Sequence, residues 1–125
     1  MSKVKALLHA SLLVSDLAAS RMFYEGVLGL KPNLQRPDLG YEGVWYDIGS
    51  QQLHLMALPD PCQGVDRPAH GGRDRHIAFQ IEGLEEVKLC LINANIPFTL
   101  SKSGRPALFC RDPDGNAIEL IEIAG

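Results

Sequence analysis

The sequence predicts an α+β fold in which two tandem βαβββ modules form one curved mixed sheet around a cleft, with the helices on the outside. One observation behind this is that both halves show the same order of local patterns: strand, helix, strand, strand, strand. Another is that the halves match position by position, since HASLLVSDL from His9 aligns with HIAFQIEGL from His76. Both begin with histidine, carry apolar residues at offsets three and five, and reach leucine at offset eight. This internal repeat of about 50 residues indicates a duplicated structural unit.

The first module is predicted to cover about residues 5–58. A short apolar stretch containing His9 alternates as a strand does and is followed by Ser15 and Asp16, which favour a helix start. The helix carries apolar residues on one face and stops at Gly29. The predicted elements are a strand over 5–14, a helix over 17–28, and strands over 30–34, 43–48 and 52–58.

Residues 59–73 are rich in proline and glycine and have the composition of a linker. The second module is predicted to follow, over about residues 74–125. Near its end, Pro113 and Gly115 indicate a tight turn between two strands. The predicted elements are a strand over 75–81, a helix over 84–95, and strands over 97–100, 107–111 and 116–123.

Length and composition predict a single domain, 1–125, with a substantial apolar core, since 46% of the 125 residues are hydrophobic. The net charge is −3 and no run of Lys or Arg stands out, so neither nucleic acid nor a membrane is expected as a partner. The three cysteines lack CxxC spacing, which fits reduced thiols. No signal-peptide pattern opens the sequence. We therefore expect a cytoplasmic protein with a small-molecule substrate.

Four side chains that can bind a metal fall on the first and last predicted strands of the two halves. His9 and His54 lie 45 residues apart in the first half, and His76 and Glu119 lie 43 apart in the second. Glu119 alternates with aliphatic neighbours, so a carboxylate on an inward face would need a partner. His9, His76 and Glu119 form a two-histidine, one-carboxylate set, with His54 as a fourth ligand. One divalent metal ion is expected: Zn, Ni, Co, Mn or Fe(II).

A lone histidine in a strand usually has no ligand role. Three of the four histidines, however, occupy repeat-equivalent strand positions, which favours a shared site. His70 lies outside the repeat and is either a solvated loop residue or part of a lid. Trp45, Tyr46 and Arg105 are candidates for the substrate-binding lining. Because Trp45 and Tyr46 alternate along one strand, only one of them can face inward.

Three segments resemble the vicinal oxygen chelate superfamily, which includes glyoxalase I, bleomycin-resistance proteins, fosfomycin-resistance enzymes, methylmalonyl-CoA epimerase and extradiol dioxygenases. They are the His9 strand with VSDL, the helical segment FYEGVLGL, and the closing FCRDPDGNAIEL. The resemblance implies metal ligands on the first and last strands of each module, which are His9, His54, His76 and Glu119 here. It also implies chelation of vicinal substrate oxygens by the metal, which acts as a Lewis acid.

The resemblance implies a metal-dependent lyase or isomerase of glyoxalase type, with Glu119 or His54 as a general base. Glyoxalase I usually has Glu where this chain has His54. One alternative is an Fe(II) extradiol-type dioxygenase, which uses the two-histidine, one-glutamate set. Another is a drug- or metabolite-binding resistance protein. Family proteins of this length usually form homodimers, with sites built within one chain or between two chains.

Overall fold

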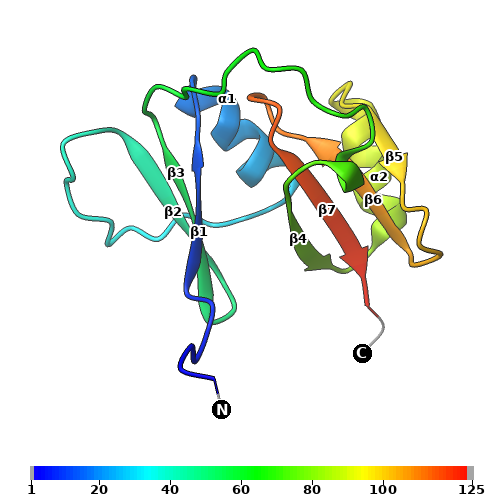
Figure 1. Ribbon diagram of the computed structural model, residues 1–125, viewed down its shortest axis with the longest axis horizontal. Helices are drawn as coiled ribbons and strands as arrows, with labels where there is room; N and C mark the ends of the chain where they lie inside the picture. Colours follow the sequence, from blue (N-terminus) through cyan, green and yellow to red (C-terminus); the bar gives the residue numbers. More distant parts are fainter. Residues whose placement is uncertain (1, 124–125) are drawn as a thin grey trace. The chain divides into compact units, whose positions relative to one another are not determined.

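The computed structural model describes residues 2–123 and divides into two compact units, Met1–Pro61 and Cys62–Gly125 (Figure 1). Each unit has its own mixed sheet and its own helix. The α+β class predicted from the sequence is confirmed. The division between the units lies within the segment 59–73.

The first unit contains a three-stranded sheet in the order β1-β3-β2. Strand β1 runs parallel to β3, and β2 runs antiparallel to β3. The elements are β1 (His9–Leu13), α1 (Leu17–Arg21), a π-helical continuation η1 (Met22–Val27), β2 (Gly43–Ile48) and β3 (Gln51–Met56).

The helical segment begins where the sequence predicts it. The carboxylate of Asp16 accepts a hydrogen bond from the backbone N–H of Ala19 at 3.1 Å, which satisfies one of the free donors at the helix start. The segment then continues without a break through Val27, and Gly29 follows with a φ of +75°. The predicted helix over 17–28 is therefore confirmed, with a wider π-helical second half.

The strand predicted over residues 30–34 is wrong. In the described part of the first unit this segment makes only an isolated bridge between Pro32 and Tyr46. Proline has no N–H to donate to a ladder, so pairing cannot extend through Pro32. The neighbouring Asn33 N–H still donates to the Trp45 carbonyl at 2.7 Å, which holds the segment beside β2. The first unit thus has three strands where four were expected.

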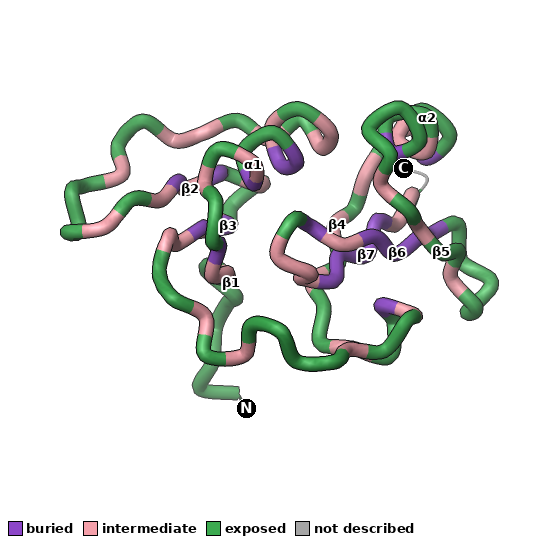
Figure 2. The backbone as a smooth tube through the Cα atoms, turned by 90° about the horizontal axis from the view of Figure 1, so that it is seen from above, coloured by how far each residue is buried: buried purple, intermediate pink, exposed green. Residues whose placement is uncertain are grey.

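The core of the first unit lies between its sheet and its helical segment. Along the middle of β2 and β3, buried residues alternate with more exposed ones, as the colours in Figure 2 show. The helix contributes Tyr24, which is 0% exposed. The buried residues of the sheet and the strand end are Val14, Val44, Tyr46, Leu53 and Leu55.

The second unit contains a four-stranded sheet in the order β4-β7-β6-β5. Strands β4 and β7 are parallel, and the other two pairs are antiparallel. All five predicted strands and helices of this half are present, with small differences at their ends. The elements are a 3₁₀ turn η2 (Gly71–Arg73), β4 (His76–Ile81), α2 (Leu84–Asn93), β5 (Phe98–Leu100), β6 (Ala107–Arg111) and β7 (Ala117–Glu122).

Strands β6 and β7 are the most deeply buried strands of the second unit (Figure 2). The turn between β6 and β7 is closed by Asp112, whose Oδ1 accepts hydrogen bonds from the N–H groups of Asp114 and Asn116 at 3.0 and 2.9 Å. At the other end of β7, Glu122 Oε1 accepts from the N–H groups of Gly83 and Leu84, both at 3.0 Å. A carboxylate at the start of α2 satisfies free donors and complements the helix dipole.

Within residues 2–123, no helix has the length and apolar character needed to cross a bilayer.

Candidate functional site

In the first unit, three rings stack on the open face of the sheet. The imidazoles of His9 and His54 have centroids 4.1 Å apart and lie within 14° of parallel. The indole of Trp45 covers the other face of His54, at 4.3 Å and 8°. These positions share a face because Trp45 pairs with His54 across β2 and β3, and Ser11, two residues from His9, pairs with His54 across β1 and β3. The rings line an open groove of about 630 Å³.

A chain of hydrogen bonds orients His54. Its Nε2 lies 2.8 Å from Oε1 of Gln52, and the amide Nε2 of Gln52 donates to Asp47 at 2.8 Å. Since the amide oxygen can only accept, His54 Nε2 carries the proton and Nδ1 keeps a lone pair. Burial lowers the pKa of His54, and the neighbouring His9 and the positive charge of Arg36 lower it further. A neutral imidazole with a free lone pair is the form that binds a metal.

Trp45 and Tyr46 lie on opposite faces of β2, as the alternation predicts. Trp45 lies beside His54, whereas Tyr46 is 0% exposed on the helix side and belongs to the core. The hydroxyl of Tyr46 donates to Glu25 Oε2 at 2.8 Å, and Glu25 is also paired with Arg21. Burial, followed by the hydrogen bond to Glu25, raises the pKa of Tyr46. Tyr46 is therefore not placed to line the open groove, because its ring packs on the helix side of the sheet.

In the second unit, His76 and Glu119 face each other on adjacent strands. The Nε2 atom of His76 lies 3.2 Å from Oε1 of Glu119. The other ring nitrogen, Nδ1, lies 2.9 Å from the carbonyl oxygen of Asp74, which can only accept, so Nδ1 carries the proton. In the neutral ring, the Nε2 lone pair then points at a carboxylate oxygen. Two acceptors at this distance require a proton or a cation between them.

Arg105 holds the second oxygen of the same carboxylate. Its Nη2 lies 3.1 Å from Glu119 Oε2. The Glu119 side chain is only 4% exposed and the Arg105 side chain is 57% exposed, so solvent weakens this pair. The guanidinium nevertheless gives the buried carboxylate a charged partner and fixes its orientation. Arg105, predicted as a lining residue, thus touches Glu119 directly.

His70 makes contacts within its own loop and with the sheet. Its Nδ1 accepts from the Gly72 N–H at 3.0 Å, and its Nε2 lies 3.3 Å from the carbonyl oxygen of Leu100. The Phe109 ring lies between the two histidines of this unit, 5.0 Å from the His70 ring and 5.2 Å from the His76 ring. His70 therefore ties the loop before β4 to β5.

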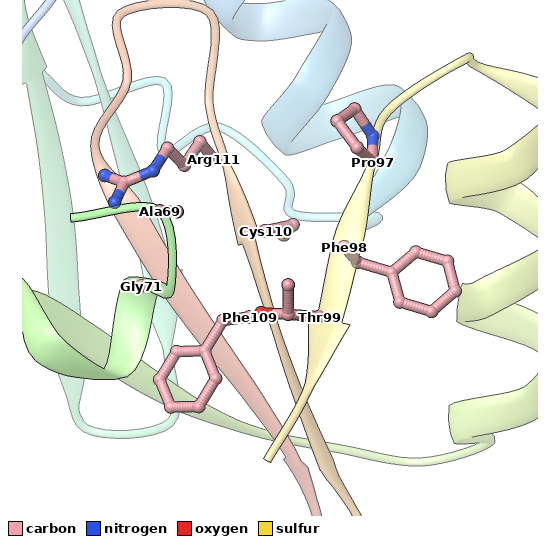
Figure 3. Close-up of a pocket in the computed structure, with 8 residues that line it drawn as sticks. All are labelled: Ala69, Gly71, Pro97, Phe98, Thr99, Phe109, Cys110 and Arg111. Atoms are coloured by element: carbon pink, nitrogen blue, oxygen red, sulfur yellow. The ribbon is translucent and has the colours of Figure 1, made fainter. Parts of the chain in front are cut away.

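A small cavity of about 160 Å³ lies on the Glu119 face of the second sheet. Phe109 pairs with Glu119 across β6 and β7, and Thr99 pairs with Phe109 across β5 and β6, so all three share this face. Figure 3 shows β6 beneath the cavity, with the loop at Gly71 on one side and β5 on the other. The Phe98 ring points away from it, toward α2. No sequence pattern indicated this cavity, because the loop that closes it is not part of the repeat.

Comparisons with known proteins agree with this architecture. The family model described as the Glyoxalase/Bleomycin resistance protein/Dioxygenase superfamily matches residues 6–120. The chain belongs to this superfamily. The resemblance noted in the sequence, to the vicinal oxygen chelate superfamily, is thereby confirmed.

Several relatives of this superfamily member are glyoxalases. It is 35% identical to Glyoxylase I 4 of Arabidopsis thaliana over 118 residues, which cover 90% of this chain and 67% of that protein. It is 32% identical to the lactoylglutathione lyase of Escherichia coli O157:H7 over 123 residues, covering 93% of this chain and 91% of that enzyme. The structure of the trypanothione-dependent glyoxalase I of Leishmania major aligns with a TM-score of 0.70 and 28% identity, covering 95% and 87% of the two chains. These relatives support a glyoxalase-like enzyme.

The donor atoms of this superfamily member suit a divalent metal. Each unit carries two candidate donors: His9 with His54, and His76 with Glu119. Imidazole and carboxylate ligands fit first-row metals, and the proton on His76 Nδ1 is held by a backbone carbonyl, as is usual for metal-bound histidines. In neither unit, over residues 2–123, do three or more His, Cys, Asp or Glu side chains gather in a way that could hold a metal. That all four donors share one ion stays a prediction.

Proposed function

We propose that this protein is a metal-dependent lyase or isomerase of glyoxalase type, acting on a small oxygen-rich substrate. The observation that carries the proposal is the meeting of His76 Nε2 and Glu119 Oε1 at 3.2 Å, where the Nδ1 contact with the Asp74 carbonyl directs Nε2 at the carboxylate and only a proton or a cation can join the two atoms. The similarity to lactoylglutathione lyase supports the reaction class.

The metal ligands in this proposal are His9, His54, His76 and Glu119, two from each unit. These ligands come either from one chain or from two chains of a homodimer. We also propose that the protein is a homodimer and is cytoplasmic. A divalent ion held by these residues would supply Lewis-acid polarisation of two chelated substrate oxygens. Zn, Ni, Co, Mn and Fe(II) are all compatible with imidazole and carboxylate donors.

Glu119 is the proposed general base. Arg105 holds Oε2 of the buried Glu119 carboxylate, which leaves Oε1 directed toward His76 and available for a proton. An oxygen held in this way can take a proton from a carbon next to a polarised carbonyl group and return it to the neighbouring carbon. His54 is the second candidate base, because its lowered pKa keeps the ring neutral. Trp45 would exclude water from one face of that ring.

A second candidate function is an Fe(II) extradiol-type dioxygenase. The observation that favours it is the donor set itself, since His9, His76 and Glu119 make a two-histidine, one-carboxylate combination, which is found in non-heme Fe(II) oxygenases.

The proposal is tested by titrating the metal-free protein with Zn, Ni, Co and Mn, and with Fe(II) in the absence of oxygen, by isothermal titration calorimetry. One ion per chain is expected, and His76→Ala should weaken its binding by at least about tenfold. His70→Ala is the matched control, because His70 stands outside the repeat, and it should leave the affinity unchanged. The loaded protein is then assayed for lactoylglutathione formation and for oxygen uptake on catechols.

If no metal binds, or if His76→Ala binds it as well as the unchanged protein, the enzyme proposals fail and a metal-free binding protein becomes the better description. Oxygen uptake on catechols with Fe(II) would favour the dioxygenase over the lyase.

A further inference from the structure

Gly43 leaves a space on the His54 face of the first sheet, and the guanidinium of Arg36 occupies it. Gly43 lies two residues before Trp45 on β2, so both positions face the same side of the sheet as His54. A Cβ atom on Gly43 would lie 2.9 Å from Nη2 and 3.2 Å from Cζ of Arg36, and would also collide with the carbonyl oxygen of Leu55. The absence of a side chain at Gly43 therefore allows the guanidinium to rest on the backbone of this face.

The loop that carries Arg36 holds the guanidinium in place from one side. Nη2 donates to the carbonyl oxygen of Tyr41 at 3.0 Å, and the Tyr41 ring lies 5.1 Å from Cζ. The cation and the ring attract each other, and the ring also limits how far the side chain can swing. The guanidinium is thus positioned without a salt bridge to any residue from 2 to 123.

Arg36 has no negative partner in the described part of the chain. No Asp or Glu oxygen among residues 2–123 lies within ion-pair distance of it, and its Nε atom is enclosed without a hydrogen-bond partner. A half-buried cation with an unsatisfied donor is unfavourable unless something compensates for it. Arginine offers five donors in a planar fork that matches carboxylate and phosphate oxygens. An oxyanion is therefore the ligand chemistry that this guanidinium suits.

An open groove of about 790 Å³ gives access to this position. It is lined by Leu17, Arg36 and residues 37–38 and 40–43. Two of the lining residues, Asp38 and Glu42, are acidic but exposed, so their repulsion of an anion is reduced by solvent and salt. The Asp38 carboxylate also accepts from the Gly40 N–H at 2.9 Å, which keeps it engaged in its own turn.

We propose that Arg36 binds an oxyanion group of the substrate, a carboxylate or a phosphate, in the groove over Gly43. The inference rests on the proposed function only in assigning the anion to the substrate. Gly43 and Trp45 lie on the same face of the sheet as His54. A substrate held by this guanidinium would therefore carry its anionic group on the face of the sheet that carries His54 and Trp45.

The competing explanation is that Arg36 only ties its loop to the Tyr41 carbonyl. The two roles differ in what a small anion does to the protein. A tether changes the melting temperature when it is removed but confers no saturable anion binding. An anion site shows saturable binding that depends on the guanidinium and on the space above Gly43.

The test uses the full chain, freed of metal by a chelator, so that its result does not depend on the metal centre. Acetate and inorganic phosphate are titrated separately, with sodium chloride as the ionic-strength control, and the Arg36 Nε–Hε and Trp45 indole resonances are followed by NMR. We expect saturable shifts with acetate, phosphate or both, and the more tightly bound anion identifies the substrate group. Arg36→Gln should weaken this binding at least tenfold as followed at Trp45. Lys31→Gln, which removes an exposed positive charge from the same unit, is the matched control and should leave it unchanged.

Gly43→Ala and Arg36→Lys complete the test. Gly43→Ala should weaken anion binding at least tenfold because its methyl group would meet both the guanidinium and the Leu55 carbonyl oxygen, and circular dichroism checks that the variant is folded. Arg36→Lys should retain part of the binding through its charge. Shifts that grow linearly and equally with chloride, or equal affinity in Arg36→Gln, would overturn the proposal. The metal titration above fails or succeeds independently of these outcomes.

Discussion

His76 and Glu119 lie with Nε2 and Oε1 3.2 Å apart because parallel pairing of β4 and β7 puts Ala117 opposite His76 and Glu119 opposite Ala78. The two residues are therefore diagonal neighbours on one face of the sheet. The carboxylate has Arg105 on its other oxygen, and the ring has the Asp74 carbonyl on its other nitrogen. These contacts orient the carboxylate and the imidazole so that Oε1 and Nε2 are directed at each other.

Replacing Glu119 with Gln should weaken metal binding by on the order of 100-fold, because a charged ligand becomes a neutral amide. The amide would also leave the Arg105 guanidinium without a charged partner. Calorimetric titration of the metal-free variant measures the loss. Glu82→Gln, which changes an exposed carboxylate of the same unit, is the control. Equal affinity in both variants would remove Glu119 from the ligand set.

Tyr46→Phe should lower the free energy of unfolding by about 1–2 kcal/mol, because the variant loses a hydrogen bond to a charged group. Glu25 keeps its pair with Arg21, so no charge is left unpaired. Metal and anion binding should not change, since Tyr46 lies on the helix side of β2. Urea denaturation measures the first effect and calorimetry the second. If Tyr46→Phe lost metal or anion binding with unchanged stability, Tyr46 would have to be counted among the residues that line the groove.

Stability should fall in acid partly because of Glu25. The hydrogen bond from Arg21, and then the one from Tyr46, lower the pKa of Glu25 below its ordinary value of 4.5. The folded state therefore holds the carboxylate charged where the unfolded state begins to bind a proton. This contribution is complete above about pH 4.5 and disappears as the pH falls through the folded-state pKa.

Melting temperatures measured from pH 7 to pH 3 test this assignment. Glu25→Gln should flatten the acid limb, whereas Glu42→Gln, at an exposed position, should not. Parallel acid limbs for Glu25→Gln and the unchanged protein would show that other groups control the pH dependence.

Gly71→Ala should destabilise the protein by about 1–3 kcal/mol, the usual effect of overpacking. Its Cβ would lie 3.2 Å from Cβ of Phe109 and 3.3 Å from Cβ of Ala117, both on buried strands. Gly26→Ala is the opposite case, because nothing lies within 4 Å of the added carbon in a helical segment. It should stabilise the protein by up to about 1 kcal/mol. Thermal unfolding of the two variants compares them, and equal effects would contradict the close packing at Gly71.

The repeat predicted much of the arrangement because each side chain occurs at a fixed offset along a strand. His54 and Trp45 share a face, and His76 and Glu119 share another, as a period of two requires. The strand predicted over 30–34 does not form, because the apolar pattern cannot replace the N–H that Pro32 lacks.

The position of Arg36 was not predicted, because it depends on a tertiary contact that has no periodic pattern in the sequence. A guanidinium from one segment lies over a glycine seven residues later, and Arg36 lies between the predicted elements of the repeat. The same holds for the contact between Gly71 and Phe109, since a loop that folds back onto a sheet leaves no periodic signal in the sequence. The Gly-rich turn signals around both segments could have marked these positions as points of close backbone approach.

Strand β7 connects the proposed chemistry to the assembly of its own unit. Glu119 and Glu122 are an odd number of residues apart, so one faces His76 and the other caps helix α2. A shift of β7 by one residue against its neighbours would turn both carboxylates to the wrong faces. It would bury one charge among aliphatic side chains and leave the helix start without its acceptor. Misaligned pairing is thus unfavourable at two places at once. The correct register of β7 is also the one that places Glu119 for its proposed role.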